Sequence, residues 1–71
     1  MLNSVKIQKL LRALAELGFK EIRRKGSHAF FEHSDGRTTL IPMHAEIRIK
    51  LLTKIIRQDL KMTKEEFAKY L

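Results

Sequence analysis

The sequence predicts a small α+β domain in which two helices pack on one side of a three-stranded antiparallel sheet. Three observations support this fold class. Apolar residues recur at helical spacing over residues 7–17 and again over residues 47–60, and the segment between them alternates like β-strands around an Asp-Gly turn. Because 71 residues allow only one small core, we expect residues 1–71 to form a single domain.

The first helix is expected to begin near Asn3 or Ser4, since either side chain can cap a helix N-terminus. Gly18 follows the last apolar position and supplies the left-handed residue that commonly ends a helix. The apolar stripe consists of Ile7, Leu10, Leu11, Leu14 and Leu17.

The three strands are expected at residues 19–25, 28–33 and 37–41. Residues 26–27 form the tight connection between the first two, and residues 34–36, Ser-Asp-Gly, form a hairpin turn. Pro42 ends the third strand because proline cannot donate to the ladder.

The second strand has two faces: His28, Phe30 and Glu32 lie on one, and Ala29, Phe31 and His33 on the other. Only one face can join the core. Both phenylalanines are suited to burial, so the sequence leaves open which way His28 points. It also leaves open whether Phe30 or Phe31 stacks on nucleic-acid bases or fills the core.

Residues 43–45 lead into the second helix, whose apolar positions are Ile47, Leu51, Leu52, Ile55, Ile56 and Leu60. Thr63 and Glu66 have the spacing of a capping box and predict a short final helix. Phe67 is expected to return to the core.

Charge and composition restrict the function. Fifteen Lys and Arg against eight Asp and Glu give a net charge of +7, which favours a polyphosphate partner over the simpler reading of a solvated lysine surface. The absence of cysteine excludes disulfides, thiolate catalysis and cysteine-ligated zinc, and fits a reducing cytoplasm. No apolar run has the length of a membrane span, and no signal peptide is apparent, so we expect a soluble cytoplasmic protein.

The three histidines are the candidates for proton transfer, since only histidine titrates near neutrality without perturbation. His28 directly follows a basic run, residues 23–25, and a Gly-Ser pair; a strand histidine satisfied by a backbone carbonyl is the simpler alternative. His33 precedes the hairpin turn and His44 lies at a helix entrance, where structural roles compete with substrate contact. No metal site is expected, because no histidine pair has the i, i+4 spacing of zinc motifs.

Several short motifs in fixed order resemble the HicA-type toxins of bacterial and archaeal toxin–antitoxin pairs. The matching residues are Gly18-Phe19, Lys25-Gly26-Ser27-His28, Phe30, His33, Asp35-Gly36-Arg37, Ile41-Pro42, His44, Leu52, Ile55-Ile56 and Glu65-Glu66-Phe67. The resemblance implies a fold like the double-stranded RNA-binding domain and a ribonuclease that cleaves messenger RNA, with His28 as catalytic residue. It also implies inhibition by a HicB-type antitoxin. Two positions depart from the family pattern. Many members have a second histidine at the position of Ala29 and a glycine at the position of Lys50.

Metal-free RNA cleavage needs a base for the 2′-hydroxyl, an acid for the 5′ leaving oxygen and cations for the phosphate. His28 can serve as the base or the acid, and His33, His44, a lysine or water takes the other role. The expected RNA-binding residues are Arg23, Arg24, Lys25, Gly26, Ser27 and Arg37. No cofactor, metal or small-molecule ligand is expected.

Two other functions share this sequence pattern. A non-catalytic RNA-binding module would have the same fold and phosphate contacts and would differ only in lacking turnover. A pure interaction protein with an acidic partner would lack salt-sensitive RNA affinity.

Overall fold

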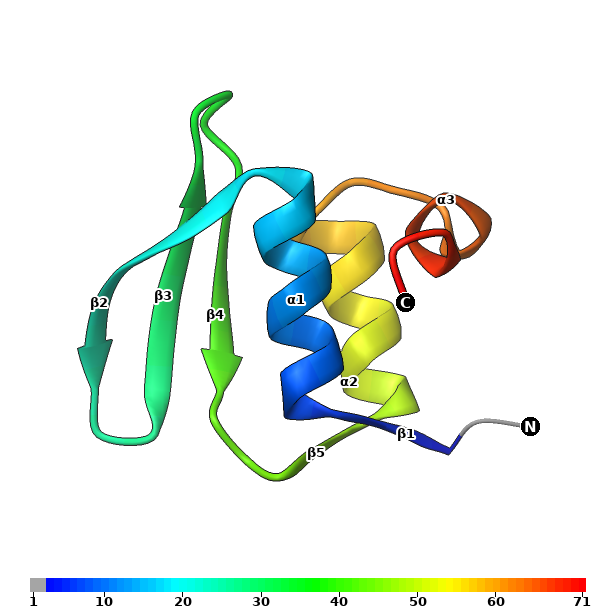
Figure 1. The fold of residues 1–71 in the computed structure, drawn as a ribbon, viewed down its shortest axis with the longest axis horizontal. Coiled ribbons are helices and arrows are strands. Elements are labelled where there is room, and N and C mark those ends of the chain that lie inside the picture. The colour runs from blue at the N-terminus through cyan, green and yellow to red at the C-terminus, as the bar shows by residue number, and fades with distance from the viewer. Residues whose placement is uncertain (1–2) are drawn as a thin grey trace.

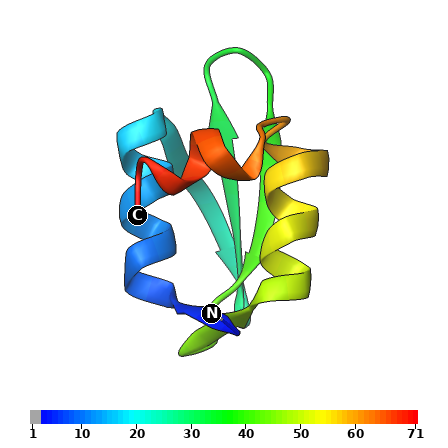
Figure 2. The ribbon, with the colours of Figure 1, turned by 90° about the vertical axis from the view of Figure 1, so that its right-hand side faces the viewer.

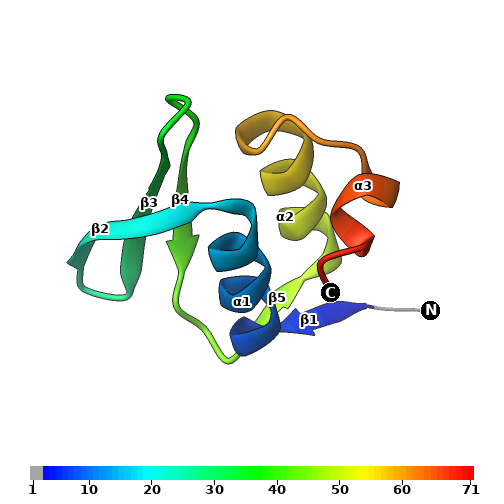
Figure 3. The ribbon, with the colours of Figure 1, turned by 45° about the horizontal axis from the view of Figure 1, so that its top comes forward.

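The computed structural model describes residues 3–71, and it confirms the predicted order of one helix, three antiparallel strands and further helices. The sheet has the order β2-β3-β4, and the helices cover one of its faces while the other face is left open (Figures 1 and 3). The elements are β1 (Ser4–Lys6), α1 (Ile7–Leu17), β2 (Phe19–Lys25), β3 (His28–His33), β4 (Thr38–Pro42), β5 (Glu46–Arg48), α2 (Ile49–Lys54), the π-helical turn η1 (Ile55–Asp59) and α3 (Lys64–Ala68).

The start of the first helix differs from the prediction. Lys6 is the N-cap residue and contributes no side-chain cap, because the preceding residues form strand β1 instead of the expected Asn3 or Ser4 cap. The Ser4 hydroxyl donates a hydrogen bond to the Glu46 carboxylate, and the Ile7 amide donates to the Ala45 carbonyl, just before β5. The end of the helix is as predicted, with Gly18 in the left-handed region at φ 102°.

The second helix also begins later than predicted. Ile47 lies in β5, where it pairs with Val5, and only 1% of its surface is exposed. The helix proper starts at Ile49. The two-stranded sheet β1-β5 therefore ties the beginnings of both helices together at one end of the domain.

The core lies between the sheet and the helices. Figure 2, viewed from the helical side, shows α1 and α2 flanking the inner face of the sheet, with α3 crossing between their ends. Ala29 and Phe31 of the central strand face this core. The predicted capping box of Thr63 and Glu66 is present at the start of α3, and it positions Phe67, which is 1% exposed.

Among the described residues, no helix is long and apolar enough to cross a membrane.

Candidate nucleic-acid interface

His28 is the first residue of the central strand, and its side chain lies on the open face of the sheet. Its neighbours in the alternation, Ala29 and Phe31, are buried under the helices, whereas His28 is exposed. The structure thereby decides the orientation that the sequence left open. Lys25 of β2 and Pro42 of β4 lie opposite His28 in the ladder, so the three residues form one row across the open face.

An irregularity in β2 brings further positive charge to this face. The ladder between β2 and β3 shifts by one residue at Ile22. Arg23 therefore lies opposite Phe30, and Lys25 lies opposite His28. A strand with uninterrupted alternation from Phe19 would place both cations on the helix side, because a slip of one residue exchanges the two faces of a strand.

Arg24 is oriented differently from the basic residues on either side of it. It pairs with Ala29, whose side chain faces the helices. Its guanidinium donates two hydrogen bonds to the Glu21 carboxylate, at 2.9 and 3.0 Å. The hydrogen bonds to this carboxylate raise the pKa of Arg24 above its ordinary value. The structure therefore brings Arg23 and Lys25, but not Arg24, to the face of His28.

A shallow hollow of about 440 Å³ lies on the open face beside His28. It is lined by Arg23, Lys25, His28, Phe30 and Leu40. The Leu40 side chain is half exposed, and the Arg23 guanidinium carbon lies 5.0 Å from the centre of the Phe30 ring. The hollow thus combines an imidazole, two cations and an apolar wall.

The turn before β3 and the segment after β4 lie together at the His28 end of the sheet. Gly26 adopts a positive φ of 59°, and a Cβ added there would meet no atom within 4 Å. The Met43 amide donates a 2.6 Å hydrogen bond to the Ser27 carbonyl. This contact places the exposed His44 on a segment that borders the turn, whereas Gly26 and Ser27 adjoin His28 directly.

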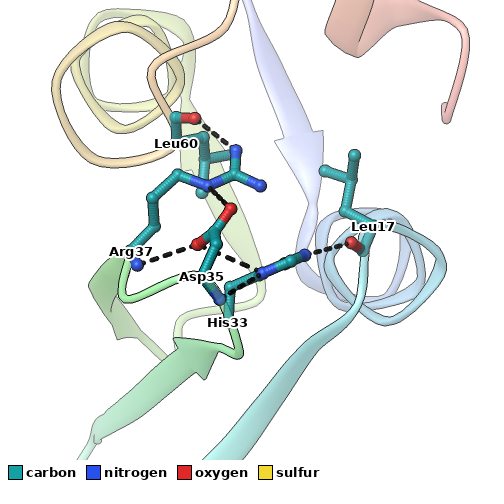
Figure 4. A network of polar contacts seen from close by, with 5 residues as sticks. All are labelled: Leu17, His33, Asp35, Arg37 and Leu60. Atoms are coloured by element: carbon teal, nitrogen blue, oxygen red, sulfur yellow. Dashed lines mark hydrogen bonds and ion pairs between the residues drawn. The ribbon is translucent and has the colours of Figure 1, made fainter.

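His33 lies at the other end of the same strand and is held in a structural network (Figure 4). Its Nε2 lies 2.9 Å from the Leu17 carbonyl oxygen, and its Nδ1 accepts a 3.0 Å hydrogen bond from the Asp35 amide. The Nδ1 also lies 3.1 Å from the Asp35 carboxylate, so both ring nitrogens have partners in this network. The ring also packs edge-on against Phe19, with a centroid separation of 5.1 Å.

Arg37 belongs to this second network rather than to the His28 face. Its guanidinium donates to the Asp35 carboxylate at 2.8 Å and to the Leu60 carbonyl at 2.6 Å, and it lies 5.2 Å from the Phe19 ring centre. The Arg37 amide hydrogen bond, followed by the guanidinium contacts, lowers the pKa of Asp35. Five residues of strand, about 17 Å, separate this end of β3 from His28.

Leu40 is the residue of the hollow that the sequence analysis did not single out. The alternation of the strand is the signal that could have found it. Leu40 lies between Thr39 and Ile41, which are buried, so its side chain faces outward. The sequence makes Phe30 and Phe31 equal candidates for stacking on a base. The structure separates the two, since Phe31 is 6% exposed in the core whereas Phe30 lines the hollow.

Within residues 3–71, no three His, Asp or Glu side chains cluster as a metal site would require. A family model described as "HicA toxin of bacterial toxin-antitoxin" matches residues 7–59. The chain belongs to the HicA toxin family. No curated protein matches it significantly.

Membership in the HicA family gives the chain a general role. HicA proteins are the toxins of toxin–antitoxin pairs and are in general ribonucleases that act on messenger RNA, so an RNA substrate and an antitoxin partner are implied. The match runs from the first residue of α1 to the last residue of η1 and spans the entire β2-β3-β4 sheet. The open face with His28 thus lies inside the matched region, and α3 lies outside it.

Proposed function

We propose that this HicA-family protein is a metal-independent endoribonuclease of the cytoplasm that cleaves messenger RNA through His28. The observation that carries the proposal is the position of His28: an exposed imidazole on a rigid central strand, in one row with Lys25 and beside Arg23. An imidazole can exchange a proton near neutral pH, and the two cations attract a phosphodiester.

The reaction follows from the chemistry of RNA. The 2′-oxygen attacks the adjacent phosphorus while a base removes its proton, and the P–O bond to the 5′-oxygen breaks as an acid protonates that oxygen. The products are a 2′,3′-cyclic phosphate and a free 5′-hydroxyl. Arg23 and Lys25 stabilise the negative charge on the phosphate oxygens, and the backbone of Gly26 and Ser27 borders the same phosphate.

His28 takes one of the two proton-transfer roles, and His44 is the better candidate for the other. Both ring nitrogens of His33 have partners in the hairpin network, about 17 Å along the strand from His28. His44 is exposed on the segment that hydrogen-bonds to the turn before His28. Arg37, held by Leu60, supports the hairpin instead of the phosphate in this proposal.

The antitoxin is proposed to be a HicB-type protein that covers the open face of the sheet. Covering this face would exclude RNA from His28 without unfolding the toxin. Addition of one equivalent of such an antitoxin is expected to stop cleavage and to protect the backbone amides around the β2–β3 turn from hydrogen exchange.

The deciding experiment incubates the purified protein with a long single-stranded RNA in the presence of a chelator, beside His28→Ala and His33→Ala. General acid–base catalysis contributes typically about 10²- to 10⁴-fold, so His28→Ala should lose at least about 10²-fold in rate. His33→Ala is the matched control: after correction for its folded fraction, it should retain the parental rate. Fragments ending in 2′,3′-cyclic phosphate support the mechanism, and cleavage by His28→Ala at the parental rate refutes it.

A non-catalytic RNA-binding module is the second candidate, and one observation favours it. Among the residues that line the hollow, His28 is the only imidazole and there is no carboxylate, so Lys25 is the one other side chain there that could act as an acid or a base. Salt-sensitive binding of RNA by the parent, with no fragments from either protein, would assign this function.

A further inference from the structure

The open face of the sheet carries a second row of side chains next to the row of His28. Arg23, Phe30 and Leu40 lie directly opposite one another on the three strands. Residues two apart on a strand share a face and lie about 7 Å apart. The row of Lys25 and His28 therefore lies about 7 Å from a second row on the same face. This second row consists of a cation, an aromatic ring and an aliphatic side chain, side by side.

This second row is unusual for a surface so rich in charge. Leu40 is 52% exposed, and it adjoins Phe30 across the strands, whereas the lysines and arginines of the chain supply its net charge of +7. The guanidinium carbon of Arg23 lies 5.0 Å from the Phe30 ring centre, so a flat cationic group already lies on this ring. Phe30 is partly exposed and lines the hollow together with Leu40, so its ring belongs to the surface of the sheet and not to the core.

We propose that Phe30 and Leu40 form a subsite for one unpaired nucleobase, next to the phosphate bound beside His28. This inference rests on the proposed function of the same face and specifies its substrate. A nucleobase is flat, and its faces stack on aromatic rings and arginine planes, while its phosphate requires cations. One nucleotide presents a base and a phosphate a short step apart, which matches the two adjacent rows.

The RNA must be unpaired where it meets this subsite. Inside a duplex both faces of a base are covered by the neighbouring bases, so no face is free to stack on Phe30. Binding a duplex here requires that the base leaves its stack, which costs a few kcal/mol. The protein therefore selects single-stranded segments through its sheet, although its element order is that of a domain type known for binding double strands.

The test measures binding instead of turnover, so its result is independent of catalysis. The probe is a 2′-O-methyl oligoribonucleotide, which lacks the attacking hydroxyl, compared with a strand of equal length and charge in which every base is missing. Base stacking on an aromatic residue is worth about 5- to 150-fold in affinity. We expect the parent protein to bind the complete strand more tightly than the strand without bases by at least about 5-fold.

Variants locate the effect. Phe30→Leu keeps apolar bulk but removes the flat ring, and it should abolish most of the preference for the strand with bases. Leu51→Ala is the matched control, because Leu51 is also partly exposed, at 38%, but lies in α2 on the helical side of the sheet. Circular dichroism of each variant establishes that it is folded. The comparison of the two RNA probes, with and without bases, uses the parent protein and needs no variant.

Equal affinity of the parent for both strands, or no RNA binding at all, overturns the inference. A loss of antitoxin binding in Phe30→Leu with an unchanged base preference also overturns it, and assigns the apolar row to a protein partner. Base-dependent binding without any cleavage supports the subsite while refuting the proposed nuclease, so the two failures are distinguishable.

Discussion

Replacing Arg37 by Ala tests whether this guanidinium serves the fold or the RNA. The charged group donates to the Leu60 carbonyl at 2.6 Å, and it lies 5.2 Å from the Phe19 ring centre. A hydrogen bond from a charged group contributes about 1.5–3 kcal/mol, and a cation–π contact about 0.5–1 kcal/mol. Leu60 is 0% exposed, so the truncation leaves its carbonyl without this donor, and we expect a loss of about 2 kcal/mol of unfolding free energy.

The expected signal is large for a chain of this size. Each kcal/mol shifts Tm by about 4–8 °C in domains of 60–100 residues, so Arg37→Ala should melt about 8–16 °C lower than the parent. Differential scanning calorimetry measures this shift. Arg57→Ala is the matched control, because Arg57 is an exposed arginine of η1, and its Tm should change by no more than the equivalent of about 0.5 kcal/mol.

RNA affinity completes the test. At a temperature where both proteins are folded, Arg37→Ala should bind RNA with the parental affinity and salt dependence. Arg23→Ala should bind RNA more weakly, while losing no more stability than the roughly 0.5–1 kcal/mol of its contact with the Phe30 ring. An unshifted Tm in Arg37→Ala together with a shallower salt slope would refute the structural role and return Arg37 to the RNA-binding residues.

Three further predictions concern the hairpin and its supports. Gly18→Ala and Gly36→Ala both place a Cβ at φ near 100°, at a cost of about 1–2 kcal/mol each. Only the Cβ at position 18 also meets a histidine ring nitrogen at 3.0 Å, so urea unfolding should show the larger loss there, and equal losses would exclude that contact. Thr39→Val removes the 2.8 Å hydrogen bond to Asp59 and should cost about 1–3 kcal/mol in urea titrations; an unchanged midpoint would dissociate this bond from stability. The pKa of Asp35 is lowered on folding, so its stabilisation is complete above its usual pKa of about 4 and is lost as the pH falls through the lower folded value. Asp35→Asn should therefore flatten the fall in stability between about pH 5 and pH 2, and an unchanged pH profile would contradict the assignment.

The elements that the sequence predicted correctly have local causes. Gly18 ends α1 because its backbone adopts a positive φ, and the capping box at Thr63 needs only its own turn. Alternation in β3 sorted the side chains of residues 28–33 into two faces correctly. It could not say which face is the core, because that depends on where the helices pack.

The misplaced elements depend on partners far away in the chain. Ile47 fits a helical period with Leu51, yet it pairs with Val5 in a strand too short to show alternation. The role of Arg37 is equally hidden, since its acceptor is a backbone carbonyl 23 residues later. Every residue has a backbone carbonyl, so the sequence does not show which of them will accept a hydrogen bond from a side chain. The basic residues can therefore be counted from the sequence, but those that stabilise the fold cannot be told from those on the open face of the sheet.

The irregularity at Ile22 makes the layout of the open face depend on chain length as well as on residue identity. At one end of β2 the buried Phe19 must face the core, and at the other end Lys25 must face the same side as His28. Ile22, which has no partner in β3, is the extra residue that allows both orientations. Deleting Ile22 leaves every pairing of the remaining residues intact, because Ile22 is the residue of β2 without a partner in β3, whereas inserting one more residue would again exchange the two faces at one end of the strand. A chain shortened by one residue at position 22 would therefore keep Arg23 and Lys25 on the open face.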